Sequence, residues 1–516
     1  MSFNHTFLNT TETHTTEAAA GLHEECGICG VIVPEAMGNN KAWRDVHYAL
    51  HSLQHRGQEA AGIATYDGEK TEMNLHAGLG LLSQVMKHLD VERGLPGQVG
   101  IGHVRYASTA NNLLQNVQPF VFNFHDMDLA FAHNGNLTNS QILRRELEDE
   151  GAVFHSTSDA EVLVHLLRRS PGENFMDKLC QALRKLKGCF NFVLLKDGEL
   201  YACVDPNQFR PLAIGALPEG GYVVASETCA LDTLGARFIE EIRAGEVVHF
   251  TPTGYQKESY TQETRSSILA MEYIYFARPD SNIAGVNVHT ARKRSGQILA
   301  QEAPAESADI VVGVPNSSLS AASGYAEAAR IPYEMGLIKS NYVARTFIQP
   351  NQAKREEAVN LKLSAVRGVV AGKKVVLVDD SLVRGTTARR IVRHLKDAGA
   401  LEVHVRIASP VFRFPSFYGI DVTHSSELLG AQQTVAEMRE TIGADSLAFL
   451  SVPGLVKAID LAEEGPYQGL CLESFTGDYP VPILDYEEQF EAELTPLQAD
   501  YLEAKAKQEK EQVDDE

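Results

Sequence analysis

Two cysteines, Cys26 and Cys29, lie in C-x-x-C spacing within the stretch HEECGICGVIVP, where a polar leader gives way to an apolar run. Such a pair can bind zinc, form a redox couple or supply one thiol as a nucleophile. Zinc needs a second pair of suitable spacing, and none follows. A redox pair belongs at the start of a helix, whereas CGICGVIV has the composition of a strand. The residues favour a nucleophile at Cys26 and core packing for Cys29.

Amide hydrolysis needs more than a thiol, and three later stretches carry suitable partners. GIGHVRYAST contains Arg105, AFAHNGNLTN contains Asn134 and Gly135, and TSDAEVLVHLL contains Asp159. The Asn134 amide and the Gly135 N–H could form an oxyanion hole. A free amino-acid substrate needs a cation for its carboxylate and an acid for its amine, and Arg105 and Asp159 could supply them. An isolated HNG is more often a turn than a site, but these stretches in order behind a cysteine indicate amide chemistry.

The polar leader determines whether the α-amine of Cys26 can act as the base in this reaction. No histidine is needed if Cys26 is the first residue of the working protein, because its own α-amine can take the thiol proton. Residues 1–25 contain no Lys or Arg and no apolar core, so we do not expect a secretory signal or a transit peptide. Their polar, Thr-rich composition predicts a disordered propeptide. We expect cleavage between Glu25 and Cys26.

A second chemistry is indicated by KVVLVDDSLVRGTTARR, in which a buried strand ends in Asp379 and Asp380 and a Ser/Gly/Thr turn leads into a helix. In a parallel sheet this loop lies at the carboxyl ends of the strands, where ligands bind. Amides at the helix start form an anion cradle, to which Ser381, Thr386 and Thr387 can add hydroxyl donors. Two carboxylates would repel a phosphate, so we expect them to hold ribose hydroxyls or Mg²⁺. For the acid pair alone, an ordinary acidic helix cap is the alternative.

Another loop, in VVGVPNSSLSAASGYAEA, has the same order of strand, tight turn and helix. Asn316, Ser317 and Ser318 lie where diphosphate oxygens or Mg²⁺ could be held, although serine also caps ordinary helices. The long polar segment that follows could close over a substrate and exclude water. Within it, Arg345 and Lys362 are candidate diphosphate contacts, with solvated surface as the alternative.

The elements that must position these residues fall into two patterns. Short β-rich runs with intervening amphipathic helices occupy residues 26–260, and from there short apolar strands each lead toward a helix. The second pattern is typical of an α/β fold with a doubly wound parallel sheet. We expect a propeptide at 1–25, a first domain at 26–260, a second at 261–485 and a charged helical tail at 486–516.

The overall composition narrows the function classes. A formal net charge of −22 argues against binding to nucleic acid or to an anionic membrane, since both need basic surface. No apolar run reaches membrane-spanning length. Seven scattered cysteines do not form a disulfide framework, and a reducing cytoplasm is the simplest setting for them.

Both halves resemble known families. The stretch around Asp379 and Asp380 resembles the phosphoribosyl pyrophosphate (PRPP) loop of type I phosphoribosyltransferases. The stretches behind Cys26 resemble the N-terminal-nucleophile, or class II, glutamine amidotransferases. LQHRGQEAAGIA is also typical of the latter, and the resemblance implies that Arg56 helps to close the glutamine pocket. Together with ARPDSNI and SFYGID, the chain resembles the amidophosphoribosyltransferase family over nearly all of residues 26–485.

The resemblance implies an αββα glutaminase sandwich followed by a type I phosphoribosyltransferase sheet. It implies a glycosyltransferase in which Cys26 releases ammonia from glutamine and ammonia then displaces diphosphate from PRPP. The product would be 5-phospho-β-D-ribosylamine, at the first step of de novo purine nucleotide synthesis. The implied PRPP contacts add Arg384 and Gly385, and Ser317 joins the two aspartates around one Mg²⁺ per subunit. Purine nucleotides are implied as feedback inhibitors, and a homodimer or homotetramer as the assembly.

A departure from the family concerns a cofactor. Many members with a short propeptide bind a [4Fe–4S] cluster through four cysteines, and the matching positions here are Leu269, Ser416, Cys471 and Ser474. Only one thiol remains, and a cubane cluster needs four thiolate ligands. We expect no cluster, with ordinary packing in its place.

Other functions are weaker interpretations. A glucosamine-6-phosphate synthase would share the first domain but needs a sugar-isomerase domain in place of VVLVDDSLVRGTT. A salvage phosphoribosyltransferase would lack the first 260 residues. A PRPP-sensing regulator is the alternative from a different class, and DNA binding without turnover would favour it.

Overall fold

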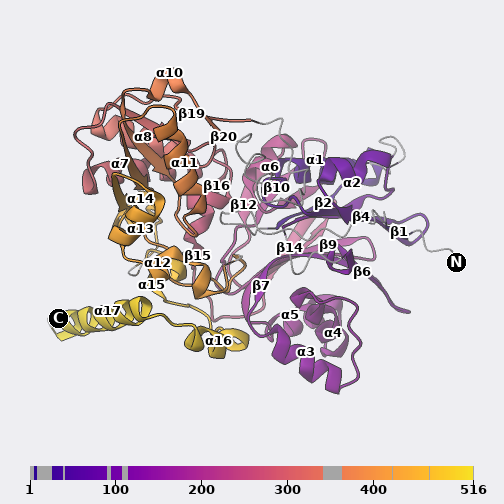
Figure 1. Ribbon diagram of the computed structural model, residues 1–516. Helices are drawn as coiled ribbons and strands as arrows, with labels where there is room; N and C mark the ends of the chain where they lie inside the picture. Colours follow the sequence, from indigo (N-terminus) through magenta and orange to yellow (C-terminus); the bar gives the residue numbers. More distant parts are fainter. Residues whose placement is uncertain are drawn as a thin grey trace.

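A computed structural model describes residues 5–7, 26–38, 41–89, 94–106, 114–340, 363–420, 422–463, 465 and 467–514. Two α/β domains follow one another along the chain and lie side by side (Figure 1). The last strand of the first domain, β14 (Gly254–Ser259), ends beside the boundary expected at residue 260. In the described part of the chain, no helix is long and apolar enough to cross a membrane.

The first domain contains a mixed sheet of eight strands. These are β1 (His5–Phe7), β2 (Gly27–Ile32), β3 (Ala60–Asp67), β4 (Glu72–Leu79), β5 (Val99–Arg105), β10 (Ala213–Ala216), β11 (Tyr222–Ala225) and β12 (Arg237–Glu241). Their spatial order is β1-β4-β3-β5-β2-β11-β10-β12. The strand that follows Cys26 is therefore central, between β5 and β11, and fully buried.

A second sheet of six strands packs on the first. Its strands, besides β14, are β6 (Phe120–Asn123), β7 (Asp128–Leu137), β8 (Gly188–Lys196), β9 (Glu199–Val204) and β13 (Glu246–Thr251). Their order is β14-β13-β9-β8-β7-β6, and every pair is antiparallel. Helices cover the outer faces, so the expected αββα sandwich is confirmed (Figure 1).

The helices divide between the two outer faces. The eight-stranded sheet is covered by α1 (Lys41–Ser52), α2 (Leu82–Val85) and α6 (Thr228–Thr233), and the six-stranded sheet by α3 (Ser140–Asp149), α4 (Val162–Arg169) and α5 (Phe175–Leu183).

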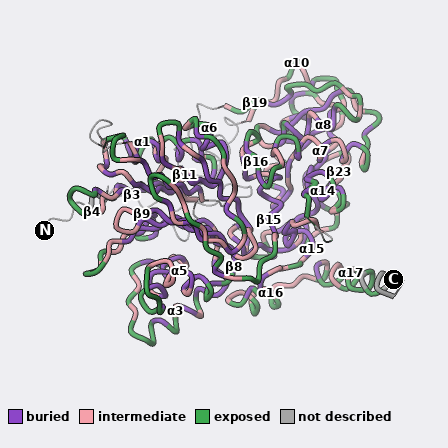
Figure 2. The backbone as a smooth tube through the Cα atoms, turned by 180° about the vertical axis from the view of Figure 1, so that it is seen from behind, coloured by how far each residue is buried: buried purple, intermediate pink, exposed green. Residues whose placement is uncertain are grey.

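The residue pattern of β8 shows why the sheets form layers. Phe192 and Leu194 face the helices, whereas Val193 and Leu195 face the other sheet. Alternate residues of a strand point to opposite faces, so a strand that is apolar throughout can be buried on both sides. At Gly30 of β2, a Cβ atom would lie only 2.7 Å from Val193 Cγ1, so this glycine permits the close approach of the sheets. Figure 2 shows the resulting buried layer.

The second domain is built on a parallel sheet. Its strands are β18 (Ile310–Gly313), β21 (Lys374–Asp379), β22 (Glu402–Ile407) and β23 (Ser446–Phe449), in that spatial order. Val375 and Leu377 pack toward one face, and Val376 and Val378 toward the other. Both faces of the sheet are therefore covered, which confirms the expected doubly wound architecture.

The helices of this domain cover the two faces of the sheet. One face carries α7 (Val288–Glu302), α8 (Leu319–Ala329) and α14 (Val452–Ile459). The other carries α10 (Arg367–Val370), α11 (Thr386–Asp397) and α13 (Val435–Ile442).

Short elements join the domains and flank the sheet. They are β15 (Ile268–Leu269), paired with β24 (Leu470–Cys471), a π-helix (Glu272–Phe276), the β16 (Asn282–Ile283) and β17 (Val286–Asn287) hairpin, the β19 (Leu337–Lys339) and β20 (Leu363–Ala365) pair, α12 (Leu429–Gln432) and α15 (Glu473–Thr476).

The C-terminal tail forms α16 (Glu487–Ala492) and α17 (Pro496–Asp514). The sequence predicts a charged helical tail here, and in the structure the first turns of α17 are docked. Gln498 is fully buried, and its Nε2 donates a hydrogen bond to the Arg413 carbonyl oxygen at 2.6 Å. The Arg413 guanidinium lies 4.7 Å from the centre of the Tyr501 ring. These contacts anchor the start of the helix, and its later turns project from the body of the molecule (Figure 1).

Candidate active sites

The geometry around Cys26 follows from the pairing of β2 with β5. Gly27 pairs with Val104, so Cys26 and Arg105 lie across from each other at one end of the two strands. Cys26 is partly exposed and Cys29 is buried, and neither forms a disulfide bond. Gly57 fits closely against this end, because a Cβ atom there would lie 2.5 Å from the Arg105 carbonyl carbon. The structure therefore places Cys26 and Arg105 next to each other.

The expected oxyanion residues lie on β7, which packs against β2 and β5 across the sandwich. Asn134 is 1% exposed, and its Nδ2 has no hydrogen-bond partner among the described residues. Gly135 has φ +142°, and a Cβ atom there would lie 2.1 Å from the Cys189 carbonyl oxygen. Only glycine suits this backbone position. β7 therefore presents a buried amide donor with an unused hydrogen next to a glycine N–H.

Asp159 lies beside the same segment of β7. Its Oδ2 accepts a hydrogen bond from the Leu137 N–H at 2.9 Å, and its Oδ1 lies 3.9 Å from His133 Nδ1. Its side chain is 22% exposed, which leaves a face open to a ligand. Burial lowers the pKa of His133, so this ring is neutral at pH 7. Asp159 is thus a carboxylate at the edge of the site, as an α-amine partner should be.

Arg56 is placed differently from the other expected glutamine residues. Its side chain is fully buried, its Nε contacts Glu227 and its Nη2 lies 2.5 Å from Glu272 Oε2. Burial alone would raise the pKa of Glu227, but the positive charges of Arg56 and His55 hold it well below its usual range. Arg56 therefore takes part in an ion-pair network that joins the domains, and its contact with glutamine stays a prediction.

The two loops expected to bind PRPP come together through a serine. β18 and β21 are neighbouring parallel strands, so the loops that follow them meet at one edge of the sheet. Ser318 Oγ donates to Asp379 Oδ1 at 2.9 Å and lies 3.4 Å from Asp380 Oδ2. Ser381 Oγ donates to Asp380 Oδ1 at 2.8 Å. Ser317 also hydrogen-bonds Asp380.

This acid pair is electrostatically strained. Burial, and for Asp379 the neighbouring carboxylate, raise the pKa of both aspartates above the ordinary range. A divalent cation would relieve this repulsion. The donors available are carboxylate and hydroxyl oxygens, which suit Mg²⁺ that keeps water and substrate oxygens in its shell. The described residues include no group of three or more His, Cys, Asp or Glu side chains that could hold a metal alone. The site fits Mg²⁺ completed by substrate.

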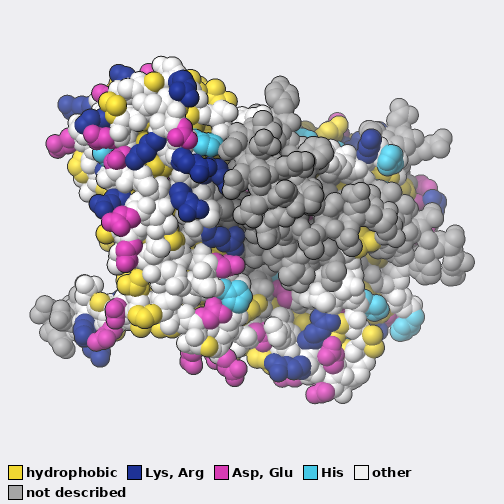
Figure 3. Space-filling model, viewed as in Figure 1, with side chains coloured by type: hydrophobic (Ala, Val, Ile, Leu, Met, Phe, Trp, Pro, Cys, Tyr) yellow, Lys and Arg dark blue, Asp and Glu magenta, His cyan; other side chains and the backbone are white. Residues whose placement is uncertain are grey.

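The anion cradle follows the acid pair. Gly385 caps α11 with φ +73°, and a Cβ atom there would lie 2.7 Å from Leu429 Cδ2. Thr386 and Thr387 then open the helix, whose N-terminal amides favour an anion. Arg384 Nη2 is paired with Glu427 Oε2 at 3.0 Å, so its charge is shared with a protein carboxylate. Figure 3 shows basic side chains gathered over the α11 part of the surface, despite the acidic net charge.

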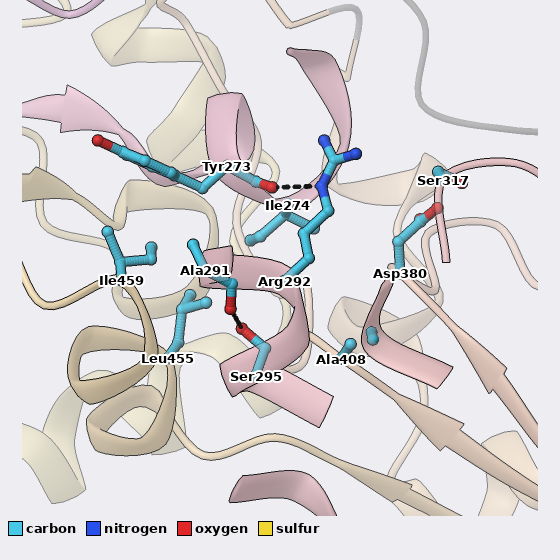
Figure 4. A pocket seen from close by; sticks show the side chains of 11 residues that line it. Tyr273, Ile274, Ala291, Arg292, Ser295, Ser317, Asp380, Ala408, Leu455 and Ile459 are labelled. Atoms are coloured by element: carbon cyan, nitrogen blue, oxygen red, sulfur yellow. Dashed lines mark hydrogen bonds between the residues drawn. The ribbon is translucent and has the colours of Figure 1, made fainter. Parts of the chain in front are cut away.

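Arg292 is a charged residue near this site that the sequence analysis missed. It is 5% exposed, its Nε donates to the Tyr273 carbonyl oxygen at 2.6 Å and its Nη2 to the Ala277 carbonyl oxygen at 2.8 Å. Its guanidinium and the Asp380 carboxyl point to the same side of a small pocket (Figure 4). In the sequence it stands in the basic run ARKRS, which resembles a solvated helix face. Its place on the face of α7 that carries Val288, Ala291 and Leu299 at helical spacing is the signal that could have identified it.

The expected diphosphate contacts Arg345 and Lys362 lie outside the described residues, as does the propeptide apart from β1. The four positions that match cluster ligands are close together. Leu269 pairs with Cys471, and Ser416 and Ser474 both donate to the same carboxylate, that of Glu473. Burial and Glu473 raise the pKa of the Cys471 thiol well above its usual range. A neutral thiol is a poor ligand. These residues do not fit an iron–sulfur cluster.

Comparisons with known proteins agree with this division into two sites. A family model described as a glutamine amidotransferase domain matches residues 103–233, and one described as a phosphoribosyl transferase domain matches residues 288–413. Amidophosphoribosyltransferase of Staphylococcus aureus strain COL is 54% identical over 483 residues, which are 94% of this chain and 96% of that protein. The Bacillus subtilis strain 168 enzyme of the same name is 50% identical over 464 residues, 90% of this chain and 95% of its own.

Solved structures give the same relationship. Glutamine PRPP amidotransferase from B. subtilis, complexed with ADP and GMP, superposes with a TM-score of 0.83 at 50% identity, covering 89% of this chain and 98% of that one. A structure described as the allosteric regulatory enzyme of purine biosynthesis gives 0.84 at 50% identity, with 89% and 97% coverage.

Proposed function

This chain belongs to the amidophosphoribosyltransferase family, and we propose that it divides the family reaction between a glutaminase site at Cys26 and a PRPP site at Asp379 and Asp380. The reaction is a glycosyl transfer of purine biosynthesis. It converts glutamine and PRPP into 5-phospho-β-D-ribosylamine, glutamate and diphosphate.

At the first site, the Cys26 thiolate attacks the glutamine carboxamide, a thioester forms and ammonia leaves. Water then releases glutamate. The Asn134 amide and the Gly135 N–H stabilise the oxyanion, because donors fixed in a buried site need no reorganisation. Arg105 binds the substrate carboxylate and Asp159 its α-amine. The observation that carries this assignment is the buried, unused Nδ2 of Asn134 on the strand packed against β2.

The base is the α-amine of Cys26, which removal of residues 1–25 creates. An N-terminal amine has an ordinary pKa near neutrality, so it can accept the thiol proton at physiological pH. No histidine is then needed at the thiol. Burial lowers the pKa of His103 to about 3 and also lowers that of His133, so neither ring is well matched to that task.

At the second site, the N-terminus of α11 holds the 5′-phosphate through Ser381, Gly385, Thr386 and Thr387. Asp379 and Asp380 hold the ribose hydroxyls, and with Ser317 they hold one Mg²⁺ per subunit. When bound, the ion offsets the negative charge of the departing diphosphate. Arg345 and Arg384 supply further positive charge near the phosphates. Ammonia then attacks C1 of the ribose as diphosphate leaves.

Regulation, assembly and localisation can be proposed from the relatives and from the cysteines. A B. subtilis relative was solved with ADP and GMP, and we infer that purine nucleotides inhibit this enzyme as feedback regulators. We propose a homodimer or homotetramer for the assembly. Cytoplasmic localisation is supported by seven cysteines that form no disulfide bond, since an oxidising compartment would favour pairing.

We propose that the enzyme contains no [4Fe–4S] cluster, because three of the four matching positions lack a thiol. Protein purified without oxygen should contain no iron above background and should lack the brown colour of a cluster. Stoichiometric iron and sulfide would contradict this.

The test of the whole assignment pairs an intact mass with two activities. The purified enzyme should begin at Cys26 and should release diphosphate from PRPP with either glutamine or ammonia. Cys26→Ala should lose only the glutamine-dependent reaction. An uncut leader with full glutamine-dependent activity would refute the α-amine as base, and a Cys26→Ala protein that still uses glutamine would refute the nucleophile.

A further inference from the structure

A buried carboxylate occupies the centre of the positions that match cluster ligands. Glu473 is 2% exposed, and three side-chain donors surround it. Ser416 Oγ donates to Glu473 Oε1 at 2.8 Å and Ser474 Oγ lies 3.3 Å from the same oxygen. Cys471 Sγ lies 2.9 Å from Oε2. We call these four residues the Glu473 knot.

The Glu473 knot is connected to the first domain through residues 416–419. Ser416 begins this segment, and its Oγ also accepts the Tyr418 N–H at 3.5 Å. The next residue, Phe417, accepts a hydrogen bond at its carbonyl oxygen from Asn136 Nδ2 at 2.9 Å. At Gly419, a Cβ atom would lie 3.3 Å from the Gly135 carbonyl carbon. The segment therefore lies directly against the oxyanion part of β7.

Further contacts hold β7 from the same side. Tyr486 OH lies 3.1 Å from Asn136 Nδ2, and Thr138 Oγ1 donates to the Pro482 carbonyl oxygen at 2.8 Å. An apolar cluster fills the space between the knot and the strand, with Cys189, Phe417 and Tyr418 among its members. The backbone that carries Asn134 and Gly135 is thus supported by residues of the second domain.

The rate of the glutamine reaction depends on how firmly the oxyanion donors are held. An oxyanion hole works only if its donors are held at the position where negative charge develops, and a displacement of about 1 Å can cost up to about 100-fold in rate. A buried carboxylate with three donors is a rigid cross-link, because leaving any of these polar groups unpaired costs free energy. A cluster at the four matching positions would cross-link these two segments and also the segment of Leu269, which here pairs with Cys471 through the backbone.

We propose that the Glu473 knot replaces the cluster as a cross-link and that Glu473, acting through Ser416 and residues 416–419, is a positioning residue for the oxyanion hole. The inference rests on the proposed role of Asn134 and Gly135. It predicts that cutting the connection that runs from Glu473 through Ser416 to β7 impairs the glutamine-dependent reaction more than the ammonia-dependent one, because only the former needs the oxyanion hole.

Two serines provide a matched test, because both donate to the same oxygen of Glu473 but only Ser416 belongs to the segment that contacts β7. Ser416→Ala should lower the ratio of glutamine-dependent to ammonia-dependent kcat by about tenfold. Ser474→Ala should lower the thermal midpoint to a similar extent and leave the ratio within about twofold. Asn136→Ala, at the other end of the connection, should lower the ratio as Ser416→Ala does.

The outcomes separate this inference from the function on which it rests. Asn134→Ala serves as the reference for losing the oxyanion hole. If Asn134→Ala keeps its ratio, the oxyanion assignment fails. If Asn134→Ala has a lowered ratio while Ser416→Ala and Asn136→Ala have the ratio of the unmodified enzyme, the positioning role alone is overturned. Equal ratio losses in Ser416→Ala and Ser474→Ala would also overturn it, since they would reflect general loosening of the knot.

Discussion

Arg56, just after α1, and Glu272, in the π-helix among the elements that join the domains, form a fully buried ion pair, with Nη2 and Oε2 2.5 Å apart. Glu272 Oε1 also lies 3.0 Å from Arg210 Nη1, and Glu227 contacts Arg56 from the other side. The carboxylates are separated from Arg56 by 216 and 171 residues in sequence. Two guanidiniums and two carboxylates thus balance one another where the domains meet.

Removing one carboxylate from this network should destabilise the protein strongly. Glu272→Gln keeps the shape of the side chain but leaves two buried guanidiniums with one carboxylate. Breaking a buried pair in this way costs about 3–5 kcal/mol, and we expect a large drop in the midpoint of thermal unfolding. The matched control is Glu440→Gln, which breaks the exposed pair with Arg439 at 3.2 Å and should cost less than about 1 kcal/mol. Equal midpoints for the two variants would contradict the network's role.

The acid pair should be needed for chemistry with either nitrogen donor. Asp379 ends β21, whereas Asp309 accepts the Lys374 N–H at 2.8 Å at the opposite end of that strand. Asp379→Asn should lower diphosphate release with glutamine and with ammonia alike, by about 100-fold or more, because it removes charge from the metal and ribose site. Asp309→Asn should change both rates by less than about twofold. A selective loss with glutamine alone would place Asp379 outside the PRPP site.

The unfavourable burial of the Asp379 carboxylate should make the stability of the folded protein depend on pH. Burial and the Asp380 carboxylate raise the pKa of Asp379 from 3.8 to about 8. The folded state therefore favours the protonated acid, so this group's contribution to stability is present at low pH and is lost as the pH rises toward 8. Asn at this position has no proton to lose. Without Mg²⁺, the stability of Asp379→Asn relative to the unmodified enzyme should rise steadily as the pH rises from about 4 toward 8.

Thermal unfolding of both proteins across that pH range, with a chelator present, measures the difference. A difference that stays constant with pH would show that Asp379 is not strained. Added Mg²⁺ should narrow the difference at pH 8, because only the acid pair gains from the cation.

Local patterns in the sequence predict the architecture, which the structure confirms, and they also select the candidate site residues, whose roles stay predictions. The acids at the end of β21 and the glycine cap of α11 are consecutive in the chain, so one stretch of sequence contains the whole loop. Cys26 and Arg105 are remote in sequence, but each lies at the end of a recognisable strand. The pairing of Gly27 with Val104 then brings them together.

Residues that act through distant contacts were missed. Glu473 lies between Cys471 and Ser474 and has no local signature, and only the fold brings Ser416 to it from 57 residues away. Arg56 was identified from its motif, but its partners Glu227 and Glu272 were not. Ion pairs between domains depend on how separate segments pack, and neither periodicity nor spacing encodes that packing. The start of α17 is a similar case, because Gln498 and Tyr501 contact Arg413, which is remote in sequence.

Gly135 offers the most direct test of the oxyanion strand. It has φ +142°, and a Cβ atom there would lie 2.1 Å from the Cys189 carbonyl oxygen, so Gly135→Ala must displace β7 or β8. Gly151 also has a positive φ, +87°, but no atom lies within 4 Å of its Cβ position. Gly151→Ala therefore reproduces the backbone strain, which costs about 1 kcal/mol, without the collision.

Gly135→Ala should lower glutamine-dependent activity by about 100-fold and leave most of the ammonia-dependent activity, because the proposed PRPP site at Asp379 lies on another sheet. Gly151→Ala should keep both activities. The measurement is diphosphate release from PRPP with each nitrogen donor, together with the thermal midpoint of each variant. If Gly135→Ala folds and uses glutamine normally, the donors of the oxyanion hole must lie elsewhere. If it loses both activities equally, the strand matters for the joining of the domains rather than for the hole.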